Sequence, residues 1–448
     1  MEKTKLSVSD VKCYNQPLIE FDSDGHDLIK TTSVGPLQGT QRLGISKLVD
    51  NSLSKAQLAK LWGIETLRSR RIPKVCPTSE KVLNLADFFC GSGGLSLGIK
   101  DALESVGLGI NHMIACDISK DSLDVYNANF KPKERFLDNA ANLLQIGKTE
   151  LIGEYRIPVL EDIQFSPELK PFINQIDIFA AGPPCQGNSN LNNKTRRDDP
   201  RNDYYISAAL IGAKLGAEII IIENVQTVKS SKQNVVEIAK IILGKAGYGI
   251  ENSEYMLKAE EFNVPQKRIR HFLIAVKNRY AKEPIDYSGL ITSPLSAMDA
   301  IEDLENISSN NLMDMPATLS KENLERINFL FDNEIYNLPD SERPYCHREK
   351  AHTYNNVYGR MFPSEPAYTI TTGFQSPGRG RFIHPKQRRG LTPREGARLQ
   401  SFPDYFKWQT PLCRVSKQSI TRLIGDAVPP NLGQVAMLIA LSSCRTYR

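Results

Sequence analysis

Cys185 is the residue whose setting points most directly to chemistry. It follows two prolines in the run Gly182-Pro183-Pro184-Cys185-Gln186-Gly187, and the apolar residues 176–181 before it predict a buried strand. Proline rings restrict the backbone, so a thiol at the end of such a strand is presented on a stiff turn, where it can act as a nucleophile. A lone free cysteine is more often a small buried hydrophobe. The motifs elsewhere in the chain decide between these two roles.

A glycine-rich turn stands nearer the N-terminus, in Phe88-Phe89-Cys90-Gly91-Ser92-Gly93-Gly94-Leu95. Apolar residues precede it and a helix-like segment, 95–106, follows, which predicts the strand, tight turn and helix that let a backbone approach a nucleotide-like ligand. A second apolar run, 112–116, stops at Asp117. Its carboxylate could accept both hydroxyls of a ribose, or it could cap the helix predicted over 120–129.

Two more predicted strands carry ionisable side chains. Four isoleucines, 219–222, lead into Glu223 and Asn224, and burial at the end of a central strand would raise the proton affinity of this glutamate. The alternative is a glutamate that accepts local backbone hydrogen bonds. Further on, alternation along 264–276 places Gln266, Arg268 and Arg270 on one face. That face suits a shared anionic or polar partner, although a solvated edge gives the same pattern.

In this order the motifs resemble those of the C5-cytosine DNA methyltransferases of bacterial restriction-modification systems, over about residues 81–448. Two later runs extend the resemblance: Arg394-Glu395-Gly396-Ala397-Arg398-Leu399-Gln400, and Ile424-Gly425-Asp426-Ala427-Val428-Pro429-Pro430-Asn431. The fold implied is α/β, with a Rossmann-like methyltransferase domain dependent on S-adenosylmethionine, a smaller target-recognition domain and a helical N-terminal extension.

The resemblance also implies a reaction. The Cys185 thiolate would add to C6 of a cytosine flipped out of double-stranded DNA, Glu223 would stabilise the ring, and Arg270 and Arg268 would contact the base or steady the nucleophile. Gln186, Asn224 and Gln266 would help bind the substrate.

S-adenosylmethionine, which leaves as S-adenosylhomocysteine, is the implied cofactor. Asp117 would hold its ribose, and Asp162, expected at the end of the next strand, would lie near its adenine amine. The family usually has Asn where this chain has Asp426, so an amide donor is lost there. The full expected set is Phe88, Cys90, Gly91, Gly93, Gly94, Leu95, Asp117, Ile118, Asp162, Ile163, Pro183, Asp426 and Ala427.

Three regions are expected along the 448 residues. Residues 81–276 would form the catalytic and cofactor-binding domain, completed by 416–448, and 277–415 the target-recognition domain. Residues 1–80 lie outside the resemblance. Their run Gln57-Leu58-Ala59, with Ser54 as a predicted N-cap, is typical of the first helix of a helix-turn-helix, with a short second helix ended by Pro73. A plain helical docking extension is the alternative.

The charge distribution indicates a surface for DNA. The net charge is only +5, but residues 281–340 have 3 basic and 12 acidic side chains, whereas 341–400 have 11 and 4. The second segment is therefore expected to present a positive surface to phosphates, with base-reading arginines within 345–389. A charged, solvated face would look similar.

Composition sets the remaining expectations. The 8 cysteines include no CxxC pair, and Cys346, His347 and His352 make only a weak zinc candidate, so no metal is expected. No long apolar run suggests a membrane span, and a free catalytic thiol suits a bacterial cytoplasm. The expected partners are double-stranded DNA, bound by a monomer, and functionally a restriction endonuclease. A tRNA cytosine-5 methyltransferase and a DNA-binding regulator with a vestigial catalytic body are the alternatives.

Overall fold

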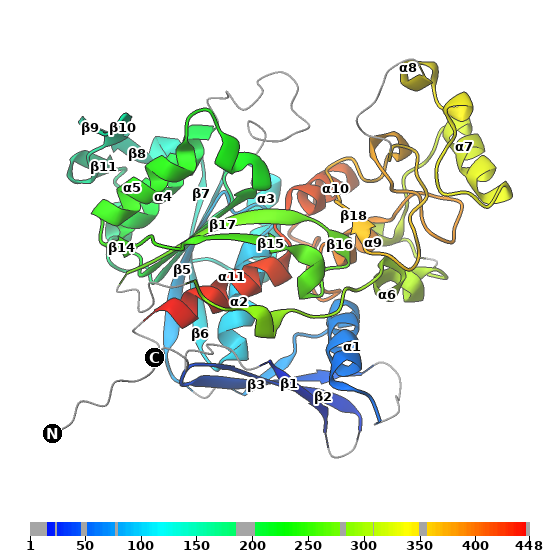
Figure 1. Cartoon of the computed structure of the whole chain (residues 1–448), viewed down its shortest axis with the longest axis horizontal. Helices are drawn as coiled ribbons and strands as arrows, with labels where there is room; N and C mark the ends of the chain where they lie inside the picture. The colour runs from blue at the N-terminus through cyan, green and yellow to red at the C-terminus, as the bar shows by residue number, and fades with distance from the viewer. Residues whose placement is uncertain are drawn as a thin grey trace.

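A computed structural model describes residues 16–22, 25–45, 52–76, 79–184, 202–277, 284–307, 309–348 and 356–444. An eight-stranded sheet forms its centre (Figure 1), in the order β14-β17-β13-β12-β5-β6-β7, with β15 also paired to β17. Strands β13 to β7 are parallel to one another, and β17 is antiparallel to β13. The strands are β5 (Val82–Phe88), β6 (Gly109–Asp117), β7 (Glu134–Leu137), β12 (Ile178–Ala181), β13 (Ile219–Val225), β14 (Tyr248–Gly249), β15 (Glu254–Lys258) and β17 (Ile269–Lys277).

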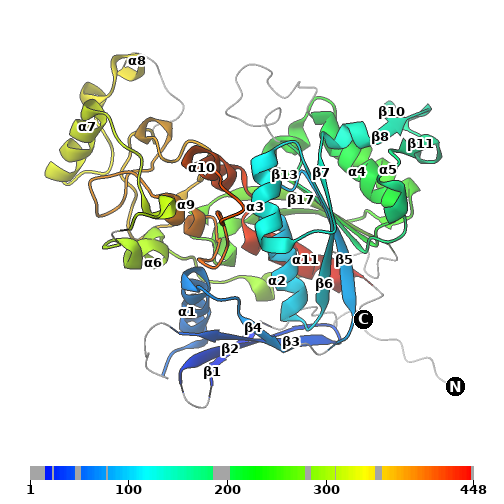
Figure 2. The same cartoon turned by 180° about the vertical axis from the view of Figure 1, so that it is seen from behind.

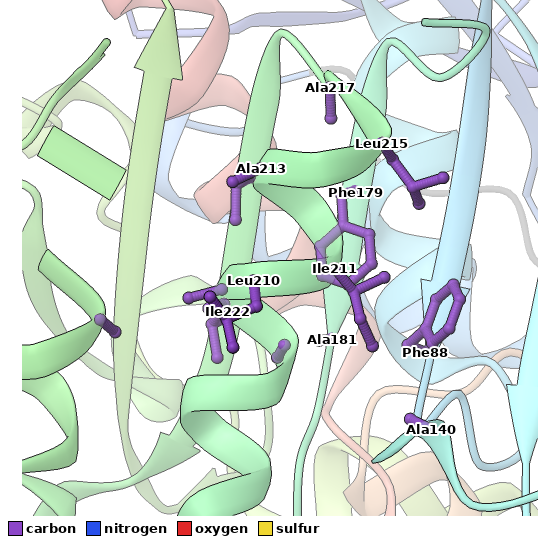
Figure 3. Packing of buried hydrophobic residues seen from close by; sticks show 14 of the residues in the cluster. Phe88, Ala140, Phe179, Ala181, Leu210, Ile211, Ala213, Leu215, Ala217 and Ile222 are labelled. Carbon is purple, nitrogen blue, oxygen red and sulfur yellow. The ribbon is translucent and has the colours of Figure 1, made fainter. Parts of the chain in front are cut away.

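Helices cover both faces of the sheet, because its central strands are apolar on both sides. The helices α2 (Gly94–Ser105), α3 (Lys120–Phe130) and α11 (Pro430–Ser443) pack on one face, and α4 (Asp203–Leu215) and α5 (Val235–Lys245) on the other. Figure 3 shows the second face, where Phe88 and Phe179 lie beside Ile211 of α4. The Rossmann-like α/β fold predicted from the sequence is confirmed.

The last helix returns from the far end of the chain to complete this domain. Figures 1 and 2 both show α11 beside α2. The contact is so close that a Cβ at Gly98 would lie 2.0 Å from the carbonyl oxygen of Pro430. The stretch Lys417–Ser443, which includes α10 (Lys417–Asp426), is long and apolar enough to cross a membrane, but most of it is buried inside the protein. It is a core element of this fold.

A small sheet insertion follows β7. Its strands form two antiparallel pairs, β11 with β8 and β10 with β9. They are β8 (Leu144–Ile146), β9 (Thr149–Ile152), β10 (Tyr155–Pro158) and β11 (Ile163–Phe165). The insertion makes no strand pairing with the central sheet, but Ile157, Ile163 and Phe165 belong to the apolar cluster beneath α4 and α5.

The N-terminal region is a small antiparallel sheet with one helix, so the prediction of a helical extension is wrong. Strands β1 (Leu18–Phe21), β2 (Asp27–Val34), β3 (Leu37–Gly44) and β4 (Lys74–Cys76) pair in that order, and α1 (Lys55–Arg68) packs against them.

The predicted start of α1 is confirmed, because the Ser54 hydroxyl accepts a hydrogen bond from the Gln57 N–H within a capping box. The predicted helix-turn-helix is wrong. Over 69–76 the chain leads through Pro73 into β4, which pairs with the edge of β3. Proline disfavours a continuing helix, and the exposed edge of β3 offers the chain backbone hydrogen bonds instead.

The region between β17 and α10 has little regular structure and its own apolar clusters. A short parallel pair, β16 (Gln266–Lys267) with β18 (Ala367–Tyr368), connects it to the catalytic side. Its helices are α6 (Ala297–Ile301), α7 (Lys321–Asp332), α8 (Tyr345–Arg348) and α9 (Pro393–Leu399). The α7 and α8 end projects farthest from the central sheet in Figures 1 and 2. The predicted borders of the target-recognition domain, at 276/277 and 415/416, stay predictions.

Substitution of Gly98 tests the closure of the domain by α11. Gly98→Ala would normally favour a helix, but here the methyl group would press on backbone, which does not yield easily. We expect a loss of about 1–3 kcal/mol in the free energy of unfolding, measured by urea denaturation. Gly44→Ala is the control, because its Cβ would meet nothing closer than 3.4 Å. Equal stability of the two variants would contradict a tight α2–α11 contact.

Candidate active site

A cavity of about 310 Å³ lies at the carboxyl edge of the sheet. Each parallel strand contributes a residue near or just after its end: Phe89 (β5), Asp117 (β6), Asp138 (β7), Pro183 (β12) and Glu223 (β13). The carboxyl ends of parallel strands lie at one edge, which is where open α/β sheets bind ligands.

The glycine turn forms one wall and decides which of two phenylalanines faces the cavity. Phe89 has a left-handed φ of +54°, and Gly93 a φ of +92°. The turn directs Phe89 into the cavity, 5.7 Å between ring centroids from Tyr204. Phe88, predicted to bind the cofactor, instead packs in the core 5.3 Å from Phe179. That prediction is wrong because the side chain of the last strand residue points to the sheet face, not beyond the edge.

Asp117 joins the glycine turn to the start of α3. One carboxylate oxygen accepts from the Gly91 N–H at 2.9 Å, and the other from the Ser119 N–H at 2.8 Å. The N-cap of α3 is Ser119, whose hydroxyl accepts from the Ser122 N–H. Burial raises the pKa of Asp117, while these backbone donors lower it. Its carboxylate is held in place and retains lone pairs for a ligand hydroxyl.

Asp87 is a second buried carboxyl group on the cavity wall, at 1% exposure. Burial raises its pKa to about 7, although the Ser96 hydroxyl donates to it at 2.6 Å and opposes that effect. Its other oxygen and the Ser92 hydroxyl have no hydrogen-bond partner among the described residues. Buried polar atoms are normally paired, so this wall offers sites to a ligand.

Glu223 and Arg270 form the charged centre of the opposite wall. Arg270 Nε lies 3.0 Å from Glu223 Oε1, and both side chains are largely buried. Burial raises the pKa of Glu223, and the charges of Arg270 and Arg268 oppose the rise. The carboxyl group is therefore set to hold a proton more readily than an exposed glutamate, yet has a cation beside it.

Arg268 and Gln266 connect segments of the backbone. Arg268 borders the cavity, but its guanidinium donates to the carbonyl oxygens of Ile370 at 3.0 Å and Ala427 at 3.2 Å. Gln266 is fully buried and lies outside the cavity; its amide donates to Leu399 O at 2.9 Å and accepts from the Ile370 N–H. The common polar face predicted for Gln266, Arg268 and Arg270 therefore does not form, because the strand breaks at Arg268 between β16 and β17.

Asn224 lies behind the cavity wall. Its amide donates to the Pro183 carbonyl oxygen at 3.2 Å, and its side-chain oxygen accepts from the Val225 N–H. Asn224 thus fixes the segment that leads to the predicted nucleophile. Cys185 and Gln186 lie outside the described residues, which stop at Pro184 and resume at Asn202.

Asp162 and Ile163 do not reach the cavity. Asp162 ends a 3-10 turn and Ile163 begins β11, which pairs with β8 in the insertion. The prediction that Asp162 ends the next strand of the main sheet is wrong, because that strand is β7, followed by Asp138 and Asn139 on the cavity wall. Both segments have an acidic residue after a short apolar run, and the sequence alone predicted the cofactor contact in the wrong segment.

The structure brings most of the predicted site residues together at this cavity. Those that line it are Cys90, Gly91, Gly94, Leu95, Asp117, Ile118, Pro183, Glu223, Arg268, Arg270, Asp426 and Ala427. Those that do not are Phe88, Gly93, Asp162, Ile163, Asn224 and Gln266. Lining residues that the sequence reasoning missed include Asp87, Phe89, Ser92, Asp138, Asn139, Tyr204 and Arg422.

Comparison with known proteins identifies the family. The model of the C-5 cytosine-specific DNA methylase family matches residues 83–438. The chain belongs to the C-5 cytosine-specific DNA methylase family. It is 35% identical over 428 residues to the type II methyltransferase M1.BsuMI of Bacillus subtilis, which covers 95% of each chain. It is 26% identical to M.DdeI of Desulfomicrobium norvegicum, over 79% of this chain and 87% of that one.

A solved structure supports the fold of this cytosine-5 methylase. A prophage-encoded protein of E. coli, assigned as a DNA modification methyltransferase, superposes with a TM-score of 0.53 at 22% identity. The match covers 81% of this chain and 99% of the other. The cavity at the carboxyl edge is therefore the candidate active site of a DNA cytosine-5 methyltransferase.

Part of the basic segment of this methylase forms ion pairs with its acidic neighbour, and the positive surface for DNA stays a prediction. Four of its side chains pair with the segment 281–340: Arg398 with Asp303 (2.6 Å), Arg394 with Asp314 (2.5 Å), Arg388 with Asp332 (2.7 Å) and Lys386 with Glu302 (2.7 Å). Arg381, at 3% exposure, donates to the Tyr336 and Arg360 carbonyl oxygens. These ion pairs join the acidic and basic segments of the region.

No group of three or more metal-binding side chains occurs in the part of the chain that the structure describes. The weak zinc candidate lies outside that part, because His352 and the side chains of Cys346 and His347 are not described.

The raised pKa of Asp87 predicts a pH-dependent cost to stability. Its pKa is about 7 in the folded protein, against an ordinary aspartate value of 3.8. Between these values the folded state keeps a proton that the unfolded state has lost, so this group makes folding less favourable as pH rises. Asp87→Asn is expected to gain up to about 4 kcal/mol in free energy of unfolding, relative to the wild type, between pH 4 and 7.

The measurement is urea denaturation of both proteins across that pH range, without cofactor. Ser96→Ala is the matched variant, because it removes the hydroxyl that stabilises the Asp87 carboxylate. It should extend the loss of stability to higher pH, because it raises the pKa of Asp87 in the folded state further. Parallel pH profiles for all three proteins would show that Asp87 titrates normally.

Proposed function

We propose that this methylase transfers a methyl group to C5 of a cytosine flipped out of duplex DNA within one short sequence, through a covalent bond between Cys185 Sγ and cytosine C6. The observation that carries the proposal is the buried Glu223–Arg270 pair, in the same cavity wall as Pro183 and Pro184. It puts a carboxyl group with a raised pKa beside the segment that presents Cys185.

S-adenosylmethionine would occupy the glycine-turn side of the cavity and supply an electrophilic methyl group when bound. Its sulfonium and ammonium groups are cationic, and four aspartates line the cavity: Asp87, Asp117, Asp138 and Asp426. Asp117 would accept the ribose hydroxyls, and Phe89 and the exposed Ile118 offer apolar surface for the adenine. The unpaired Ser92 hydroxyl and Asp87 oxygen support this fit.

The nucleophilic step would use Cys185 and Glu223 together. As the Cys185 sulfur bonds to C6, negative charge develops over N3 and C5 of the ring. Glu223 would share its proton with N3, and Arg270 would hold the carboxyl group in position through their 3.0 Å contact. C5 then takes the methyl group. Loss of the C5 proton restores the double bond to C6 and expels the thiolate.

Asn224 and Arg268 would act as positioning residues. Asn224 holds the Pro183 carbonyl oxygen, and Arg268 holds Ile370 of the recognition region and Ala427 of the C-terminal segment. Neither role requires contact with the base.

The proposed substrate is duplex DNA in a restriction-modification setting, since M1.BsuMI is named a type II methyltransferase. A cognate restriction endonuclease, action as a monomer and a bacterial cytoplasmic setting belong to the same proposal. Arg379 is a candidate phosphate contact, because it is exposed and has no ion pair among the described residues, unlike the paired arginines around it.

Bisulfite sequencing tests the site and the product. Mixed-sequence duplex DNA is incubated with the protein and S-adenosylmethionine, with Cys185→Ala in parallel. We expect protected cytosines within one short motif for the wild type and at least a roughly 1,000-fold lower rate for the variant, since nucleophile removal costs on this order. A tRNA substrate in a matched assay distinguishes RNA methylation. Absence of protection in DNA would overturn the proposal.

A mechanism-based trap tests the covalent step. DNA with 5-fluorocytosine at the methylated position has no C5 proton to lose, so the adduct should persist after methyl transfer. We expect a complex stable in denaturing gel electrophoresis with the wild type and none with Cys185→Ser. Glu223→Gln should form it at least about 100-fold more slowly, through loss of proton transfer to N3. Rapid trapping by Cys185→Ser would show that another residue is the nucleophile.

A further inference from the structure

A second cavity, of about 140 Å³, lies between the N-terminal sheet and the catalytic body and shares no lining residue with the active-site cavity. We call it the rear cavity. Strands β1 to β3 and α1 line one side, and α2 and α11 the other. Figure 1 shows the N-terminal sheet below α2 and α11, with α1 standing between this sheet and α6.

Two opposite charges face the rear cavity without pairing. Lys30 comes from β2 and Asp101 from α2, and both are half-buried. No ion pair within 4.0 Å joins them, and neither has a hydrogen-bond partner among the described residues; Lys30 Nζ lies 5.5 Å from the centroid of the Trp62 ring. Burial lowers the pKa of Lys30 to about 8 and raises that of Asp101 to about 7. The charge of Asp101 opposes the shift in Lys30, and the charges of Lys100 and Lys30 oppose the shift in Asp101.

A neutral polar side chain in the same lining is also unsatisfied. Thr32 is 2% exposed, and its hydroxyl has no hydrogen-bond partner among the described residues. Gln41 is 5% exposed and faces the same space. A buried hydroxyl without a partner costs about 1–3 kcal/mol, so such groups are kept where a water or a ligand completes them.

Part of the remaining lining is apolar and comes from several elements, beside polar side chains such as Lys55, Asn431 and Gln434. Trp62 of α1 and Val435 and Leu438 of α11 are each at most 6% exposed, and Ile19 and Leu290 complete the set. A ligand that fits must therefore present both a charged end and an apolar body. Simple anions and cations would satisfy only one of the two charges.

We propose that the rear cavity binds a small zwitterion with an apolar body, the class of the apolar α-amino acids. Its carboxylate would pair with Lys30 and accept from Thr32, its ammonium group would pair with Asp101, and its side chain would contact Val435 and Leu438. The volume suits one such molecule. The inference does not depend on methyl transfer, because the two cavities are separate.

Isothermal titration calorimetry of the full-length protein with L-leucine tests the proposal. Three related probes each remove one feature: 4-methylpentanoate lacks the ammonium group, 3-methylbutylamine lacks the carboxylate and glycine lacks the apolar body. We expect one L-leucine per chain, and at least tenfold weaker binding of each related probe. Absence of L-leucine binding at millimolar concentration, or equal binding of any of the three, would overturn the proposal.

Variants locate the site. Lys30→Met and Asp101→Asn should each weaken L-leucine binding at least tenfold, whereas Lys148→Met, on the exposed β8–β9 connection, should not. Thermal melting and binding of S-adenosylhomocysteine confirm that each variant is folded. If a charge change prevents folding, Thr32→Val provides a milder and nearly isosteric variant, which should weaken L-leucine binding severalfold. Unchanged affinity in folded Lys30 and Asp101 variants would place L-leucine elsewhere.

Discussion

The buried joint around Gln266 and Arg268 is the constraint on which the rest of the structure depends. The Arg268 guanidinium binds backbone carbonyl oxygens of Ile370 and Ala427, and Gln266 binds Leu399 and Ile370. Segments more than 100 residues apart in sequence therefore meet beside the first strand residues of β17. A buried guanidinium is costly unless its donors are paired, so the three segments must assemble together. Arg270 follows two residues after Arg268, near the start of β17, and its contact with Glu223 of β13 depends on this joint.

The recognition region shows how a charge sum can mislead. Its acidic and basic halves pair with each other, through contacts such as Arg398–Asp303 and Arg394–Asp314. Both arginines also contact Asp404. In this region, which has few helices or strands, such ion pairs help the apolar side chains to hold the segments together. The net charge of a segment says little about the field outside it when the opposite charge folds onto it.

The sequence predicted the elements built from local patterns and missed those set by distant partners. Residues 219–222 are uniformly apolar and branched, which is decisive for a buried parallel strand, and Ser54 with Gln57 is a clear helix start. The left-handed backbone at Phe89 turns this side chain, and not that of Phe88, into the cavity. No local sequence pattern predicts this turn, since non-glycine residues rarely adopt a positive φ. Strand β4 depends on the free edge of β3. The sequence does not show that an insertion follows β7, so it predicts Asp162, within that insertion, at the end of the next strand.

The return of α11 has a consequence for synthesis of the enzyme in the cell. The helix packs on α2, and α2 begins at the glycine turn of the active-site cavity, whose wall also includes Asp426 and Ala427. A ribosome exposes these residues last, so the glycine turn and Glu223 emerge before the C-terminal wall of the cavity exists. The cavity is therefore complete only after residues 417–443 have been translated and α11 has packed on α2.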